Sequence, residues 1–304
     1  MDYMGDVIMS DYVRKINFQN FCDHVLNREA DESITHQEMF QNFHSKLNEI
    51  EENDLVFCRA EYMVNGMLNQ IINDVPVPIN LVIHGGDYLV SYDWLDSPKI
   101  KNLFCAELNA NMFGLNKTNK FSIPWGWGEV RHGWKTKEEF DLVWNKSATK
   151  NNLLYIPNHT LNQYYHDSVR SYFLKDLYDS NVFCLNNIFD NEAISEEGYY
   201  QKLHKSKFCI VIPGASWSDQ PIRVWECLLR KTIPIMKRSF SNWWRSGLEQ
   251  TTSLHGLPIL FVNEWNEINE TLLESIDVEW EGVHEKLLQS YWNEFISQQV
   301  LSCQ

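Results

Sequence analysis

The sequence predicts an α/β protein with two Rossmann-like domains that face each other across a cleft. Short apolar runs alternate with amphipathic stretches along the chain, which is the pattern of parallel strands joined by helices. The chain has 304 residues, enough for two domains of roughly 150 residues each. The polar stretch 145–152 has no apolar periodicity and precedes a new apolar run, so the expected domains are 1–148 and 149–304.

Each predicted strand is a short apolar run, and each predicted helix is an amphipathic stretch beside it. In the first half, strands are expected at 54–59, 79–84, 102–107 and 120–124, and helices at 35–51, 61–73 and 137–144. In the second half, strands are expected at 152–156, 182–185, 207–212, 232–236 and 257–262, and helices at 164–178, 196–205, 221–229, 264–274 and 283–299. Residues 1–30 are acidic and weakly periodic, and we expect a loosely attached helix there.

Charge and composition argue against several classes of protein. A net charge of −15 would repel a phosphate backbone, so no nucleic-acid partner is expected. No stretch approaches the ~18 apolar residues of a membrane span. Residues 1–15 carry three Asp and no apolar run, unlike a signal peptide, so we expect a cytoplasmic protein without an integral membrane segment. The seven cysteines form no Cys-x-x-Cys pair, and most are expected to be reduced core residues: Cys58, Cys105, Cys184 and Cys209.

The segment 207–236 carries most of the functional signal. A buried strand is expected to end at Pro213 and Gly214, followed by a small polar loop and a helix with Ser218 or Asp219 as its N-cap. Ligands of open α/β sheets lie outside the carboxyl ends of the strands. The N–H groups of the first helical turn and the helix dipole are suited to a phosphate group there.

The helix that follows has one polar stripe, formed by Arg223, Glu226 and Arg230. Arg223 lies in the first turn, where its guanidinium can reach a diphosphate. Glu226, one turn further on, can accept both hydroxyls of a ribose. The alternative is an ordinary exposed helix face, on which Glu226 pairs with Arg223 or Arg230.

This segment resembles the nucleotide-sugar-binding half of the exostosin-like glycosyltransferases, which are two-domain enzymes of the GT-B type. The matching positions are Pro213, Gly214, Ser216, Ser218, Arg223, Glu226, the strand 232–236 and the tail 257–268. Weaker likenesses to soluble bacterial, algal and viral members lie at 81–87 and 122–134. In those stretches Gly85 and Gly86 replace the usual Asn-Ser, and Trp125 begins a Gly- and Trp-rich stretch of different sequence.

The resemblance implies transfer of a sugar from a nucleotide-sugar, expected to be a UDP-sugar, to an oligosaccharide or other glycan acceptor, with inversion and without a metal or cofactor. It also implies a final helix that packs back on the first domain. The expected donor-binding residues are Arg223, Glu226, Pro213, Gly214, Ser216, Ser218, Asn158, His159, Arg170 and Arg238. No Asp-x-Asp pair is present to hold a metal-bound diphosphate.

Acceptor-side residues are expected at strand ends in the first half. Asp87 is the first candidate for the base that takes the acceptor proton, His84 the second and Glu129 the third. The alternatives are a histidine that closes a strand and an aspartate that bonds to its own turn. Trp125, Trp127 and Trp134 are expected to stack on the acceptor sugar or, alternatively, to pack in the core.

Two other functions remain open from the sequence. One is a GDP-sugar-dependent, fucosyltransferase-like enzyme with the same architecture and a different base. The other is a non-catalytic carbohydrate-binding protein on the same fold, because fold alone does not determine function.

Overall fold

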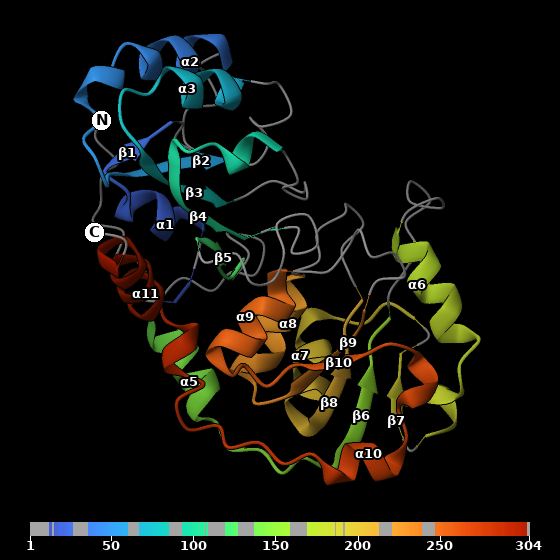
Figure 1. Ribbon diagram of the computed structural model, residues 1–304. Coiled ribbons are helices and arrows are strands. Elements are labelled where there is room, and N and C mark those ends of the chain that lie inside the picture. The colour runs from blue at the N-terminus through green and yellow to red at the C-terminus, as the bar shows by residue number, and fades with distance from the viewer. Residues whose placement is uncertain are drawn as a thin grey trace.

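The protein consists of two lobes, each built on a five-stranded parallel sheet (Figure 1). The computed structural model describes residues 12–13, 15–26, 36–59, 67–84, 93–106, 108, 119–126, 137–158, 169–185, 187–190, 192–212, 221–238 and 247–302. Within these residues no helix has the length and apolar character to cross a membrane. The predicted fold class, α/β with two parallel sheets, is confirmed.

The strands of the first sheet lie side by side in chain order. They are β1 (His24–Val25), β2 (Leu55–Arg59), β3 (Ile79–His84), β4 (Ile100–Cys105) and β5 (Lys120–Ser122). Helices α2 (His36–His44) and α3 (Met67–Asp74) join successive strands. They pack on the same face of the sheet, because right-handed crossovers that all move in one direction stay on one side.

Alternation along the strands divides the core of this lobe into two layers. Leu81 of β3 packs with the layer under α2 and α3, whereas Val82 points to the opposite face. That opposite face is covered by α1 (Lys15–Phe21) and by α11 (Gln289–Ser302), which contributes the fully buried Trp292. The last helix of the chain therefore packs on the first sheet (Figure 1).

The strands of the second sheet do not follow chain order. They are β6 (Asn152–Ile156), β7 (Asn187–Phe189), β8 (Ser206–Ile210), β9 (Ile233–Lys237) and β10 (Leu260–Val262), arranged as β10-β9-β8-β6-β7. The chain runs outward from β6 to β7, returns to the other side of β6 and continues in that direction. The order therefore reverses between β6 and β8.

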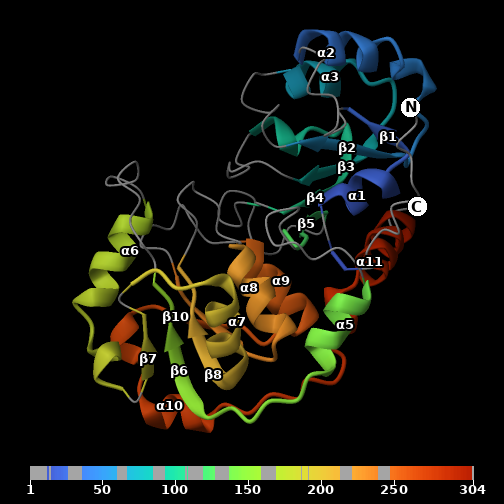
Figure 2. The ribbon, with the colours of Figure 1, turned by 180° about the vertical axis from the view of Figure 1, so that it is seen from behind.

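This reversal distributes the helices over the two faces of the second sheet. Helix α6 (Val169–Tyr178) and α10 (Glu270–Ser275) pack on one face. On the other face lie α5 (Lys137–Asn145), α7 (Glu196–Lys205), α8 (Ile222–Leu229) and α9 (Gly247–His255). Right-handed crossovers require α6 on one side and α7 and α8 on the other. Helix α7 is consequently a neighbour of α8 (Figure 2).

Several local predictions are wrong, and the stretch 264–274 is not one helix but a 3-10 turn, Trp265–Glu267, followed by α10. The stretch 182–185 forms no strand but the 3-10 turn Asn181–Cys184, because the side chain of Ser180 caps the N–H of Val182, and the strand lies at β7 instead. Helix α8 begins after Pro221, which is its N-cap without a side-chain hydrogen bond, so neither Ser218 nor Asp219 has that role. Cys184, expected in the core, is exposed.

The two lobes are joined at the open edge of β5 by helix α9. The N–H of Ser122 donates to Oε1 of Gln250 at 2.7 Å, and Nε2 of Gln250 donates to the carbonyl of Lys120 at 3.1 Å. The carboxamide thus occupies the place of a neighbouring strand and satisfies backbone groups that a sheet edge leaves unpaired. Gly247 makes this approach possible, since a Cβ there would lie 2.5 Å from Oγ of Ser122.

Residues Tyr12 and Val13 form a second link. The Tyr12 ring stacks on Phe140 of the second core at 4.5 Å between ring centres, and its hydroxyl donates to Asp141 at 2.9 Å. Val13 belongs to the core of the first sheet. Gly126 lies against Val13 with φ of 76°, and a Cβ there would be 2.3 Å from the Val13 carbonyl oxygen, so only glycine fits.

Replacing Gln250 with alanine is expected to lower the free energy of unfolding by about 2–4 kcal/mol, because it leaves two buried backbone groups of β5 without a partner. Denaturant unfolding of the intact chain measures the loss. The matched control is Gln298→Ala on the exposed side of α11, which should change stability by no more than about 0.5 kcal/mol. Equal losses in both variants would show that the edge contact contributes nothing.

The free energy of unfolding should also decrease as the pH falls, because of His255 at the end of α9. Burial, and then the charge of Lys286, lower the pKa of His255 from 6.5 to about 4. Between these values the unfolded chain binds a proton that the folded protein excludes. Stability therefore decreases as pH falls from 6.5 and levels off below 4. His255→Gln should reduce the loss between pH 7 and pH 4.5 by about 1–2 kcal/mol. An unchanged pH dependence of unfolding would refute this.

Candidate functional site

The reversal of strand order places the candidate site at the carboxyl ends of β6 and β8. Asn158 follows the end of β6 by two residues and is half-buried. Several predicted donor-side residues follow the same strand ends but lie outside the described residues: His159, Pro213, Gly214, Ser216 and Ser218. Arg170 lies in the first turn of α6, and its side chain is not among those described.

Helix α8 leads away from this edge and carries the predicted polar stripe. Arg223 lies in the first turn and is half-buried, and its guanidinium carbon is 5.8 Å from the ring centre of Tyr199 in α7. Glu226 and Arg230 are only 4% and 3% exposed. The stripe is therefore not an ordinary exposed helix face, because α7 covers it.

The carboxylate of Glu226 is held by two tyrosines of α7. The Tyr199 hydroxyl donates to Oε2 at 2.9 Å, and the Tyr200 hydroxyl donates to Oε1 at 3.3 Å. Burial first, and then the charge of Glu226, raise the pKa of both phenols, so both stay protonated and act as donors. Each carboxylate oxygen of Glu226 therefore accepts a hydrogen bond from one phenol, which fixes the side chain in one position.

Arg230 completes this cluster from the far end of α8. Its guanidinium carbon lies 3.7 Å from the ring centre of Tyr200, and Nη1 donates to the backbone carbonyl of Glu226 at 3.1 Å. Burial lowers the pKa of Arg230, and the nearby charge of Glu226 opposes that shift. The aromatic face and the carboxylate together stabilise a cation that is almost removed from water.

Sequence reasoning missed the two tyrosines. The available signal is the adjacent pair Tyr199-Tyr200 in the helix that precedes the Pro-Gly strand. A second missed group lies after β7, where Tyr155 donates to Asp190 at 2.6 Å and Lys202 forms an ion pair with the same carboxylate. Asp190 is 4% exposed, and the Tyr155 hydroxyl and the Lys202 ammonium together stabilise its buried charge near the strand ends.

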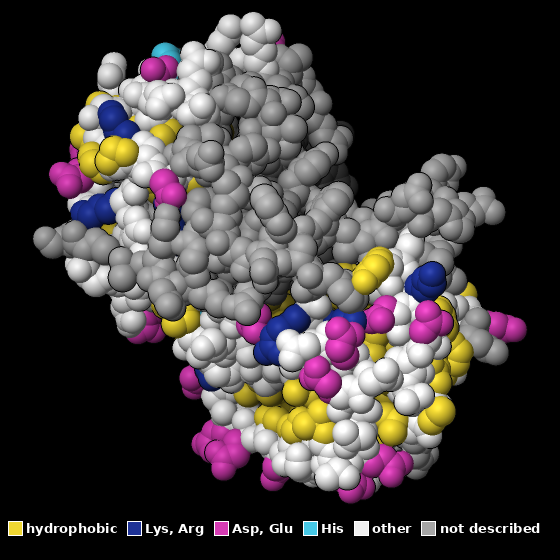
Figure 3. All heavy atoms as spheres, turned by 45° about the vertical axis from the view of Figure 1, so that its right-hand side comes forward, with side chains coloured by type: hydrophobic (Ala, Val, Ile, Leu, Met, Phe, Trp, Pro, Cys, Tyr) yellow, Lys and Arg dark blue, Asp and Glu magenta, His cyan; other side chains and the backbone are white. Residues whose placement is uncertain are grey.

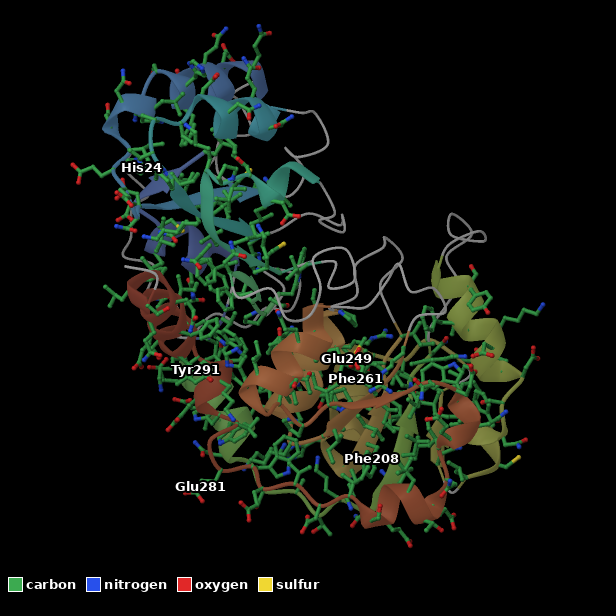
Figure 4. The ribbon with its side chains drawn as sticks, viewed as in Figure 1. His24, Phe208, Glu249, Phe261, Glu281 and Tyr291 are labelled. Atoms are coloured by element: carbon green, nitrogen blue, oxygen red, sulfur yellow. The ribbon has the colours of Figure 1, made fainter. Side chains whose placement is uncertain are left out.

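Arg238 follows the end of β9, as expected, and is engaged by protein groups. Its Nε donates to Oε1 of Glu249 in α9 at 2.8 Å, and Nη1 donates to the carbonyl of Phe261 in β10 at 3.3 Å. Glu249, in α9, and Phe261, in β10, are labelled in Figure 4. The guanidinium therefore ties α9 to the second sheet.

The structure brings His84 and Trp125 together in the first lobe. The His84 ring lies 5.2 Å from the ring of Phe18 and 5.4 Å from that of Trp125, and Nε2 donates to the carbonyl of Pro124 at 3.0 Å. With 1% of its surface exposed, His84 closes the end of β3 within a stack of aromatic rings. Asp87, Glu129, Trp127 and Trp134 lie outside the described residues.

Among the side chains that the structure describes, no three His, Cys, Asp or Glu come together as ligands for a metal ion.

No protein-family model matches the chain, and no curated protein sequence matches it. Among solved structures, it is similar to the N-terminal domain of Candida albicans trehalose-6-phosphate phosphatase, with 10% identity and a TM-score of 0.40 over 97% of this chain and 80% of the other. It is also similar to a Burkholderia vietnamiensis α,α-trehalose-phosphate synthase (UDP-forming), with 10% identity and a TM-score of 0.37 over 88% of this chain and 79% of the other.

An Escherichia coli structure, described as trehalose-6-phosphate bound with UDP-2-fluoro glucose, gives 8% identity and a TM-score of 0.39 over 87% of this chain and 78% of the other. At such scores these likenesses carry no weight for the function, which rests on the residues of this chain.

Proposed function

We propose that this protein is a glycosyltransferase that moves a sugar from a nucleotide-sugar, a UDP-sugar, to a hydroxyl of a glycan acceptor. One observation carries the proposal. At the reversal of strand order, α8 begins beside the strand ends with Arg223 in its first turn and Glu226, held by two phenols, one turn further on. A nucleoside diphosphate requires this combination of a cation for phosphate and a carboxylate for ribose.

In the proposed donor site, each polar group contacts one part of the nucleotide-sugar. Arg223 and the N–H groups at the start of α8 bind the diphosphate. Glu226 accepts the ribose hydroxyls. Asn158, His159 and the loop with Pro213, Gly214, Ser216 and Ser218 surround the nucleotide, with Arg170 and Arg238 as outer cations. No metal is needed, because the Arg and the helix dipole carry the positive charge.

The transfer step is proposed to invert the anomeric carbon. The carboxylate of Asp87 takes the proton of the acceptor hydroxyl, and the acceptor oxygen forms a bond to C1 of the sugar. The bond from C1 to the diphosphate oxygen breaks with its electron pair, and Arg223 stabilises the charge on the departing UDP. Trp125, Trp127 and Trp134 line the acceptor side, and His84 holds the strand end that leads to Asp87.

We also propose that residues 1–148 form the acceptor domain and residues 149–304 the donor domain. The protein is proposed to be related to the exostosin-like enzymes and to act in the cytoplasm. A GDP-sugar-dependent transferase and a non-catalytic carbohydrate-binding protein are the competing outcomes of the experiment below.

Calorimetry with UDP, GDP, ADP and CMP tests the donor site, first without metal and then with manganese. We expect UDP to bind without metal, and Arg223→Ala to weaken it about ten- to a hundredfold, because charge-assisted hydrogen bonds contribute about 1.5–3 kcal/mol. Lys175→Ala, which removes an exposed cation of α6, is the matched control and should bind UDP as the wild type does.

Selective GDP binding would move the protein to the fucosyltransferase-like class. Failure of every nucleotide to bind to the folded protein would favour the non-catalytic alternative, and a requirement for manganese would refute the metal-free donor site.

Asp87→Asn is expected to lower the turnover of UDP-sugar, followed as UDP release, about a hundredfold or more, because it removes the base. UDP affinity should stay unchanged. Asp179→Asn, at an exposed aspartate after α6, is the control. If Asp87→Asn turns over at the wild-type rate, Asp87 is not the base, and His84→Gln and Glu129→Gln are the next variants to measure.

A further inference from the structure

A cavity of about 700 Å³ lies beside α7, away from the strand ends described above. One wall is α7, and the other is the segment that leads from the end of α5 to the start of β6. Its lining includes Lys146, Tyr200, Gln201, His204, Lys205 and Arg230. A volume of this size is in the range of small-molecule sites, about 300–1,000 Å³.

One face of α7 lines the cavity, and the other packs in the core of the second lobe. Tyr200 and His204 are four residues apart and therefore lie on the same side of the helix, as do Gln201 and Lys205. Leu203 belongs instead to the buried core of the second lobe. Apart from the ring of Tyr200, the residues of α7 that line the cavity are thus polar or charged.

Three of the residues that line the cavity are cations, Lys146, Lys205 and Arg230, although the chain carries a net charge of −15. Acidic side chains are spread over the surface of the second lobe in Figure 3. At the cavity, Lys146 and Lys205 are exposed, and neither forms an ion pair with a described residue. Lys150 lies close enough to interact electrostatically with His204, and it donates to the carbonyl of Arg230 at 2.8 Å. This gathering of positive charge favours an anion.

His204 lies within this group of cations. Its Nε2 is buried and makes no hydrogen bond to any described residue. Burial, followed by the charges of Lys150, Lys146, Arg230 and Lys231, lowers the pKa of His204 to about 4. A buried polar nitrogen without a partner is costly, by about 1–3 kcal/mol.

We propose that this cavity is a second small-molecule site, which binds a phosphate ester through Lys146 and Lys205. A phosphate dianion offers several acceptor oxygens and enough charge to offset two lysines. The volume of the cavity, about 700 Å³, is much larger than a free phosphate needs, because a phosphate is only a few times the size of a water molecule, which occupies about 30 Å³. The remainder of the cavity, with Gln201 and the carboxylates of Glu196 and Glu197, can pair with hydroxyls of the esterified part.

The cavity shares two residues with the cluster that holds Glu226. Tyr200 lines the cavity and donates to Glu226, and Arg230 lines the cavity and donates to the Glu226 carbonyl. A ligand that displaces either side chain therefore changes the support of Glu226. Coupling between the cavity and nucleotide binding follows, and by linkage it is reciprocal. This coupling, unlike the cavity site itself, rests on the proposed function.

Calorimetry on the full chain tests the site with ribose 5-phosphate, inorganic phosphate and ribose as probes. We expect ribose 5-phosphate to bind, ribose not to bind, and Lys146→Ala/Lys205→Ala to weaken the ester about tenfold or more. The control Lys46→Ala/Lys175→Ala removes two exposed lysines elsewhere and should bind as the wild type does. Binding must also persist in Arg223→Ala, which separates this site from the donor site.

Absence of ester binding, or equal binding by the two double variants, would overturn the proposal. Inorganic phosphate that binds as tightly as the ester would overturn the assignment of an ester and leave free phosphate as the ligand.

The coupling has its own measurement. Saturating ribose 5-phosphate should change the Kd for UDP severalfold in the wild type, and Tyr200→Phe should abolish the change while ester binding is retained. An unchanged Kd for UDP would overturn the coupling. If UDP does not bind at all, the proposed function fails, whereas ester binding is still judged by the lysine variants.

Discussion

The reversal of strand order in the second sheet is the constraint on which the rest of this lobe depends. Because parallel strands are joined by right-handed crossovers, a chain that moves outward from β6 to β7 and then back past β6 must place α6 on one face and α7 and α8 on the other. This makes α7 and α8 neighbours and lets Tyr199 and Tyr200 reach Glu226. The same reversal opens the strand ends at which α8 begins.

The elements with strong periodicity could be predicted from the sequence. The strand before Pro213 and helix α8 are examples, since a continuous apolar run and an amphipathic stripe lie next to each other there. The short strand β7 could not be, because three half-buried residues carry no distinct pattern. The apolar stretch before it predicts a strand, but it forms a 3-10 turn in which Ser180 caps the N–H of Val182 and Val182 is buried.

Contacts between distant segments could not be predicted. That Tyr200 faces Glu226 depends on strand order, which leaves no periodic trace in the sequence. The contact between Gln250 and β5 joins residues 128 positions apart. His84 was placed correctly at a strand end, but its burial comes from Phe18 and Trp125, which other parts of the chain supply. A strand end alone therefore identifies where a residue lies and not whether a substrate can reach it.

The burial of Glu226 bears directly on how the candidate site would work. A carboxylate at 4% exposure is stable only if donors surround it, and two phenols meet that need. Those phenols also hold the carboxylate in one position, so a ligand that hydrogen-bonds to it has little side-chain entropy to overcome. Arg230 adds a nearby positive charge and a hydrogen bond to the backbone of the same residue. The contacts that stabilise Glu226 in the fold are therefore also the ones that would orient it for the proposed binding role.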